Sequence, residues 1–163
     1  MSKITKAIEF INIKHCEQTR KDGTPYVWHP LKVALMVKEA GYSEDYQLAA
    51  LFHDLLEDTD ATEDEILMLS NEKVLAAVKL LTKTSDNKRT YIDLILKNEI
   101  AKVVKSYDRI HNLQEAKTAS PKFVAGYLSN TKENYLGKFC SELDDSYYAL
   151  YLLYIQQYDS SIV

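Results

Sequence analysis

The sequence is short of the residues that interrupt helices. It has four glycines and three prolines among 163 residues. Because glycine and proline mark tight turns and break helices, their scarcity favours a mostly helical chain. The two cysteines, Cys16 and Cys140, are too few and too far apart for a disulfide framework or a cysteine-based zinc motif. We expect both to be reduced thiols.

The sequence also lacks a long apolar run and a strong excess of either charge. No segment approaches the length of a membrane span, and the N-terminal residues form an amphipathic pattern, not the core of a signal peptide. The net charge of −4 and the isoelectric point near 5.6 give no general attraction for DNA, RNA or an anionic membrane. We therefore expect a cytoplasmic protein. A nucleotide substrate stays possible, since one local basic pocket can bind it.

The pattern that is present is that of a helical globular protein. Apolar residues make up 46% of the chain and charged residues 27%, which is ordinary for a soluble domain. The length suits one domain, residues 1–163, with a single core. Apolar residues recur at helical spacing and no segment alternates as a strand does, so we predict an all-α helical bundle. The predicted helices cover residues 4–19, 29–41, 43–59, 62–69, 71–81, 91–96, 100–116, 121–139 and 141–158, with a surface loop at 82–88.

The most informative segment is His53-Asp54-Leu55-Leu56-Glu57-Asp58-Thr59, which follows a continuous apolar run. If one helix continues through it, His53, Asp54, Glu57 and Asp58 lie within roughly 140° of one face. An imidazole and three carboxylates at such spacing repel one another or stay desolvated unless something neutralises them. This crowding predicts a divalent metal ion.

Further ligands for such an ion must come from elsewhere in the chain. His29 stands directly before Pro30, which suits the first turn of a helix. Asp108 and Asn112 share a helical face in a later segment. Two imidazoles and two carboxylates form a mixed nitrogen and oxygen set, which suits manganese, iron or zinc better than magnesium. His15 and His111 lack such a setting, and we interpret both as structural.

Three segments together resemble a known family. They are Arg20-Lys21-Asp22-Gly23-Thr24-Pro25-Tyr26-Val27-Trp28-His29-Pro30, the His53-to-Thr59 segment, and Asp108-Arg109-Ile110-His111-Asn112-Leu113. Their order and spacing resemble the HD superfamily of metal-dependent phosphohydrolases, and most closely the RelA/SpoT-type guanosine polyphosphate (ppGpp) hydrolases. The resemblance implies an HD-type helical bundle. The length leaves no room for the synthetase or regulatory domains of long members, so we expect a small stand-alone form.

The resemblance also implies a role for each matching residue. The metal ligands, usually to manganese with zinc, iron or cobalt possible, are His29, His53, Asp54 and Asp108. The residues that position and deprotonate the attacking water are Glu57 and Asp58. Arg20 and Lys21 flank the guanine base, Asn112 contacts the sugar or base edge, and Tyr135 corresponds to a family tyrosine of the downstream helix.

The chain departs from the family where substrate is recognised. After Leu113 the family usually continues with Arg-Thr, whereas this chain has Gln114 and Glu115. The change removes a candidate phosphate-binding cation and adds a negative charge. Two enzyme hypotheses therefore stay open: hydrolysis of the 3′-pyrophosphate of ppGpp or pppGpp, or hydrolysis of another nucleotide, such as a deoxynucleoside monophosphate or another 3′-phosphorylated nucleotide. A third hypothesis is a nucleotide-sensing binding module.

The last predicted helix carries tyrosines at helical spacing. Tyr147, Tyr151, Tyr154 and Tyr158 follow one another at intervals of three or four residues. Stripes of this kind are usually core or self-association surfaces. We expect either a core contact or a homodimer formed through this helix.

Overall fold

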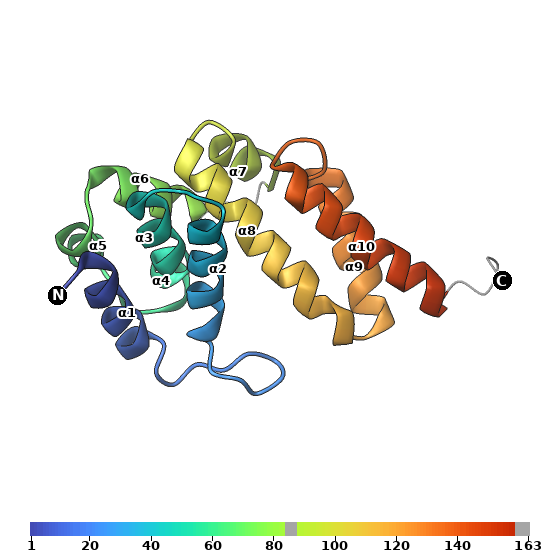
Figure 1. Ribbon diagram of the computed structural model, residues 1–163, viewed down its shortest axis with the longest axis horizontal. Helices are drawn as coiled ribbons and strands as arrows, with labels where there is room; N and C mark the ends of the chain where they lie inside the picture. The colour runs from blue at the N-terminus through green and yellow to red at the C-terminus, as the bar shows by residue number, and fades with distance from the viewer. Residues whose placement is uncertain (84–87, 159–163) are drawn as a thin grey trace. The chain divides into compact units, whose positions relative to one another are not determined.

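The computed structural model describes residues 1–83 and 88–158, and within these residues helices account for all the regular structure apart from one isolated bridge between Thr19 and Pro25. The predicted all-α class is confirmed. Figure 1 shows the helices in chain order. Their bounds are α1 Lys3–Lys14, α2 Trp28–Glu39, α3 Glu44–Phe52, α4 Leu55–Asp58, α5 Glu63–Leu69, α6 Glu72–Leu81, α7 Lys88–Ile95, α8 Glu99–Glu115, the short 3₁₀ helix η1 Ala116–Thr118, α9 Pro121–Asn134 and α10 Ser141–Tyr158.

The chain divides into two compact units, Met1–Lys105 and Ser106–Val163. The division falls inside α8, so one continuous helix belongs to both units. A single domain over the whole chain stays a prediction. None of the described helices is long and apolar enough to cross a membrane.

Side chains that the sequence placed at helix starts act as caps. Thr62 accepts a hydrogen bond from the backbone N–H of Glu65, whose side chain accepts from the N–H of Thr62, which completes the predicted capping box of α5. The Asn71 side chain caps α6 by accepting hydrogen bonds from the backbone N–H groups of Lys73 and Val74. Pro121 occupies the first turn of α9, where its missing N–H costs nothing.

In the first unit, α3 is the central helix. It packs against α1, α2 and α6, and α2 and α3 lie side by side in Figure 1. Its residues Leu48 to Phe52 are all buried, together with apolar residues of the helices around it, among them Ile11, Val33 and Val78. A helix that is apolar on every side is stable only inside a core. This burial places the end of α3, where the His53-to-Thr59 segment begins, in the interior of the unit.

In the second unit, α9 and α10 pack together over a small core. Its buried members are Leu113, Ala116, Val124, Leu128, Tyr147 and Leu150. The tyrosine stripe of α10 is thus only partly core, since Tyr147 is buried whereas Tyr151 and Tyr158 are exposed. The homodimer through this helix stays a prediction.

Some predicted bounds were wrong. The first helix ends at Lys14, not near Thr19, and α9 ends at Asn134, not at Phe139. After α9 the chain turns through Gly137, whose φ of +68° favours glycine. Of the predicted loop at 82–88, residues 84–87 lie outside the described part. Cys16 and Cys140 are free thiols, as predicted.

Candidate metal centre and active site

The His53-to-Thr59 segment is not one continuous helix, which corrects the prediction. Helix α3 ends at Phe52, His53 and Asp54 form a turn, and α4 begins at Leu55. A local side-chain hydrogen bond forms at this break. The Nδ1 atom of His53 lies 2.7 Å from the carbonyl oxygen of Ala50, which a continuing helix would use for its own backbone. Side chains that periodicity placed on one helical face are instead presented from a turn and a short helix.

His29 reaches the same region from the start of α2. The chain enters this helix through a hydrogen bond from the His29 N–H to the carbonyl oxygen of Tyr26, 2.9 Å long. Pro30 follows in the first turn, as predicted. The His29 imidazole is buried, with 2% of the residue exposed, and so is that of His53. Two buried imidazoles, one from the start of α2 and one from the turn after α3, therefore lie in one interior region of the first unit.

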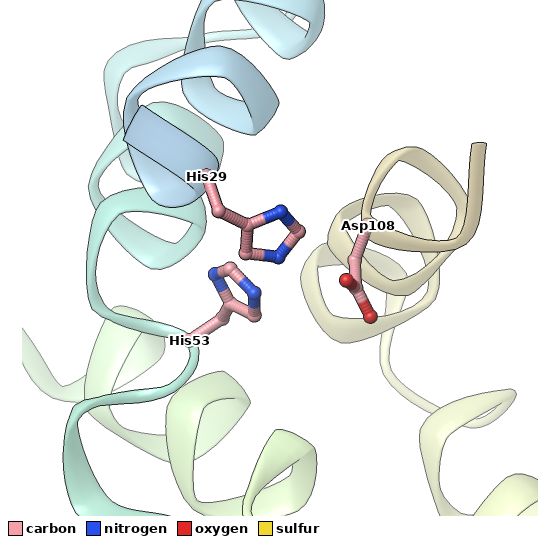
Figure 2. A group of neighbouring side chains, drawn as sticks. All are labelled: His29, His53 and Asp108. Atoms are coloured by element: carbon pink, nitrogen blue, oxygen red, sulfur yellow. The ribbon is translucent and has the colours of Figure 1, made fainter. Parts of the chain in front are cut away.

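Asp54 joins the two imidazoles. Its Oδ2 atom lies 2.9 Å from Nε2 of His53 and 3.7 Å from Nε2 of His29. The two rings stand edge to face with centroids 5.2 Å apart, and one nitrogen of each lies within 4.8 Å of the other. Figure 2 shows these imidazoles, His29 from α2 and His53 from the turn after α3. Two nitrogens and a carboxylate oxygen thus converge within the first unit.

The chemistry of this donor set fits a divalent metal ion. A carbonyl oxygen only accepts hydrogen bonds, so the contact with Ala50 puts the proton of neutral His53 on Nδ1. The lone pair is then on Nε2, the atom that faces Asp54. A backbone carbonyl that fixes the tautomer of a metal-binding histidine in this way is the usual arrangement. The site is therefore a candidate His/Asp metal centre.

Glu57 and Asp58 follow on α4, both solvent-accessible. One oxygen of Glu57 accepts a hydrogen bond of 3.0 Å from the backbone N–H of Lys83, so this carboxylate is held by the segment after α6. Partial burial raises the pKa of the Asp58 carboxyl above its ordinary value, and the charges of Asp54 and Glu57 act in the same direction. Two carboxylates that are candidates for proton transfer thus lie one turn beyond the candidate metal ligands His53 and Asp54.

Arg20 and Lys21 lie on a tight loop before α2. The Thr19–Pro25 bridge closes the loop, and the side chain of Asp22 accepts hydrogen bonds from the backbone and hydroxyl of Thr24. These hydrogen bonds hold the pKa of the Asp22 carboxyl below its ordinary value. Lys21 is exposed at the loop. The Arg20 guanidinium lies over the ring of Tyr26, 5.9 Å from its centroid.

Asp108 and Asn112, the two polar residues predicted to share a face, belong to the second unit. The Asn112 amide donates a 2.6 Å hydrogen bond to Oδ1 of Asp108, which confirms the shared helical face. Asp108 is buried, and Figure 2 shows its side chain on α8. The contact orients the carboxylate, and it gives Asn112 a role on Asp108 that the sequence did not predict.

Tyr135 is buried at the end of α9. The guanidinium of Arg109 lies over the rings of Tyr135 and Tyr127, at 4.0 and 4.3 Å from their centroids. The same guanidinium donates to the side chain of Asn130 at 2.7 Å. In the structure Tyr135 is thus a packing partner of Arg109. Its role in substrate binding stays a prediction.

The departure at Gln114 and Glu115 lies on the last turn of α8. Both residues are exposed. The Glu115 carboxylate lies 3.4 Å from Nε2 of His111, one turn earlier. His111 thus has a helix neighbour of opposite charge whenever it is protonated, which agrees with its structural interpretation.

The fold and the donor set agree with one family. A profile for the HD domain matches residues 7–135. The chain belongs to the HD domain family, and the predicted membership is confirmed. Among its relatives, the guanosine-3′,5′-bis(diphosphate) 3′-pyrophosphohydrolase of Aquifex aeolicus is 42% identical over 120 residues, or 68% of this chain and 17% of that protein. Human MESH1, which has the same enzyme name, is 35% identical over 130 residues, or 74% of this chain and 73% of that protein.

A solved structure shares the fold. It belongs to a metazoan ortholog of SpoT that is described as hydrolyzing ppGpp, and it matches with a TM-score of 0.75 at 23% identity, over 96% of each chain. The similarity to RelA/SpoT-type proteins that the sequence motifs predicted is confirmed. The bacterial relatives are much longer, since the chain spans 17% of the Aquifex protein and 21% of a Synechocystis relative.

Proposed function

We propose that this protein hydrolyses the 3′-pyrophosphate of guanosine polyphosphates, converting ppGpp or pppGpp to GDP or GTP and pyrophosphate. The observation that carries the proposal is the convergence of the buried His29 and His53 with the partly buried Asp54, one turn before two accessible carboxylates. Relatives named as hydrolases of this substrate support it, MESH1 above all because the match covers most of both chains. We further propose that the protein acts in the cytoplasm on this small-molecule substrate, with neither nucleic acid nor membrane as partner.

The metal would be held by His29, His53 and Asp54, with Asp108 as the remaining ligand. Asp108 supports this role by its chemistry: it is a buried carboxylate that Asn112 orients, and a buried carboxylate is stable when a cation compensates its charge. Manganese is the proposed ion, because the set mixes imidazole and carboxylate. When bound, such an ion lowers the pKa of a water molecule and neutralises charge that develops on the phosphate.

Glu57 and Asp58 would handle the proton of the attacking water. The water oxygen forms a bond to the phosphorus attached to the 3′ oxygen, and the bond between that phosphorus and the 3′ oxygen breaks. Pyrophosphate leaves with the water oxygen, and the 3′ oxygen takes up a proton. The raised pKa of Asp58 suits a group that accepts a proton and passes it on. Glu57 is fixed by Lys83 and can hold the water in place.

Arg20 and Lys21 would bind the guanine base. A guanidinium and a lysine side chain can both lie flat on an aromatic ring. The closed loop that carries them limits the conformations of the backbone, so little entropy is lost when the base binds. Asn112 would contact the sugar or base edge of the nucleotide while its amide donates to Asp108. Tyr135 would support this part of the binding site by packing against Arg109.

Glu115 favours a second candidate, hydrolysis of another nucleotide. The residue adds a negative charge to the end of α8, where the related pattern has threonine, and its carboxylate lies 3.4 Å from Nε2 of His111. A deoxynucleoside monophosphate or another 3′-phosphorylated nucleotide carries less charge than a pyrophosphorylated one. A nucleotide sensor without activity is the third candidate, but it has no need of both Glu57 and Asp58.

The test is a nucleotide panel. The purified protein is incubated with Mn²⁺ and with ppGpp, pppGpp, deoxynucleoside monophosphates and 3′-phosphorylated nucleotides, and pyrophosphate and orthophosphate are measured separately. We expect pyrophosphate from ppGpp and pppGpp. Orthophosphate from monophosphates alone would support the second candidate. Binding without turnover in Mn²⁺, Zn²⁺, Fe²⁺ and Co²⁺ would support the sensor.

A further inference from the structure

Tyr26 contacts two of the proposed functional groups through one hydroxyl. Its phenol donates a 2.5 Å hydrogen bond to Oδ2 of Asp54 and lies 3.4 Å from Oδ2 of Asp58. Asp54 is a proposed metal ligand and Asp58 a proposed proton acceptor. All three residues belong to the first unit. Tyr26 lies in the Arg20-to-Pro30 segment that resembles the family, but the resemblance implies no role for it.

The oxygen that Tyr26 contacts is the one that faces the imidazoles. Oδ2 of Asp54 also lies 2.9 Å from Nε2 of His53 and 3.7 Å from Nε2 of His29. Rotation of the carboxylate about its last bond would carry Oδ2 away from both nitrogens, and the hydrogen bond from Tyr26 opposes this rotation. A hydrogen bond from outside the ligand set that orients a ligand commonly strengthens metal binding.

The phenol is itself held firmly. The ring of Tyr26 packs against the rings of His15 and His29, with centroids 4.9 and 5.9 Å away. Its backbone N–H donates to the carbonyl oxygen of Gln18 at 2.9 Å, next to the Thr19–Pro25 bridge. Because ring and backbone are both fixed, the hydroxyl is in place before any metal binds.

The same region holds the backbone of Asp58. The side-chain amide nitrogen of Gln18 donates a 2.5 Å hydrogen bond to the backbone carbonyl oxygen of Asp58. The side-chain oxygen of Gln18 therefore faces Nδ1 of His15, 2.7 Å away. A carbonyl only accepts, so Nδ1 of His15 carries a proton. Tyr26 therefore acts on the Asp58 side chain, and the pair of His15 and Gln18 acts on its main chain.

We propose that Tyr26 is a positioning residue of the metal centre, whose hydroxyl holds Oδ2 of Asp54 toward the two imidazoles and sets its distance from Asp58. The proposal rests on the proposed metal site but not on the identity of the nucleotide. It assigns no proton transfer to Tyr26. Loss of the hydroxyl should weaken metal binding and change the surroundings of the bound ion without unfolding the protein.

The test compares Tyr26→Phe with Tyr91→Phe. The Tyr91 hydroxyl donates a 2.7 Å hydrogen bond to the carbonyl oxygen of Leu81, so the control removes a similar bond from the same unit without touching the site. Binding of Mn²⁺ to the metal-free proteins is measured by electron paramagnetic resonance, from both the free-ion signal and the spectrum of the bound ion. Thermal unfolding of the metal-free forms is recorded alongside.

We expect Tyr26→Phe to lose roughly 10- to 100-fold in Mn²⁺ affinity and to change the spectrum of the bound ion, while Tyr91→Phe changes neither. Unaltered affinity and spectrum in Tyr26→Phe would overturn the proposal, as would equal losses in both variants in step with their stability. Wild-type protein that binds no Mn²⁺ would overturn the metal site itself. Because no nucleotide is present, failure of the nucleotide panel is a separate result.

Discussion

The imidazole of His53 is hydrogen-bonded to the carbonyl oxygen of Ala50, 2.7 Å away and one turn earlier in the chain. This contact lies where α3 ends. It places the proton of neutral His53 on Nδ1, so that Nε2 faces Asp54 at 2.9 Å. The end of the helix thus coincides with a fixed histidine tautomer at a candidate metal site.

Asp54→Asn should abolish tight metal binding. Asparagine keeps the size of the side chain and can still accept from Tyr26, but it removes the charge that balances the ion. We expect the affinity for Mn²⁺ to fall about 100-fold or more, which is a larger loss than substitution of a residue that only orients a ligand would cause. The affinity is measured by isothermal titration calorimetry. The exposed Asp93→Asn is the matched control and should bind normally; tight binding by Asp54→Asn would mean that Asp54 is no ligand.

Glu57→Gln should keep the metal and lose the rate. Glutamine can still accept the hydrogen bond from the Lys83 backbone, so the local structure is retained. Without the Glu57 carboxylate, which together with Asp58 positions and deprotonates the attacking water, kcat should fall by roughly 10² to 10⁴. Steady-state release of pyrophosphate and Mn²⁺ titration are measured on the same sample. Metal loss equal to that of Asp54→Asn would make Glu57 a ligand and contradict the role assigned to it.

Glu115→Gln tests whether the departure from the family pattern affects substrate choice. The substitution removes one negative charge and keeps the shape, near His111. If the carboxylate opposes a pyrophosphorylated nucleotide, KM for ppGpp should fall several-fold, corresponding to roughly 0.5–1 kcal/mol for an exposed charge, with kcat unchanged. Gln114→Glu is the reciprocal variant and should raise KM. Identical KM values in all three proteins would show that charge at this turn does not select the substrate.

Arg109→Lys should destabilise the second unit. Lysine keeps the charge but not the planar group that lies between Tyr127 and Tyr135. Burial opposes the charge of Arg109, while the two tyrosines and their hydrogen bonds raise the pKa of its guanidinium and keep it protonated. We expect a loss of roughly 2 kcal/mol in the free energy of unfolding, measured by urea denaturation. The exposed Lys122→Arg is the control for the reverse exchange, and an unchanged midpoint in Arg109→Lys would contradict the stacking role.

Much of the fold follows from local patterns. The capping box at Thr62, the Asn71 cap and Pro121 each specify a helix start within a few residues, because the groups that interact are neighbours in sequence. Helix ends were predicted less well. The first helix and α9 both end several residues earlier than their apolar patterns suggest, because apolar spacing alone does not indicate the turns that follow.

The sequence by itself determined which residue types are available for chemistry: imidazoles, carboxylates and cations in three segments whose order is typical of the HD family. Tertiary structure decided how they meet in the first unit. Periodicity placed His53, Asp54, Glu57 and Asp58 on one helix, whereas the structure divides them between a turn and α4. The meeting of Asp54 with His29 and Tyr26 depends on hydrogen bonds and burial between residues more than twenty positions apart. Local spacing carries no information on such contacts, because only the packing of α2 against α3 brings those residues within reach.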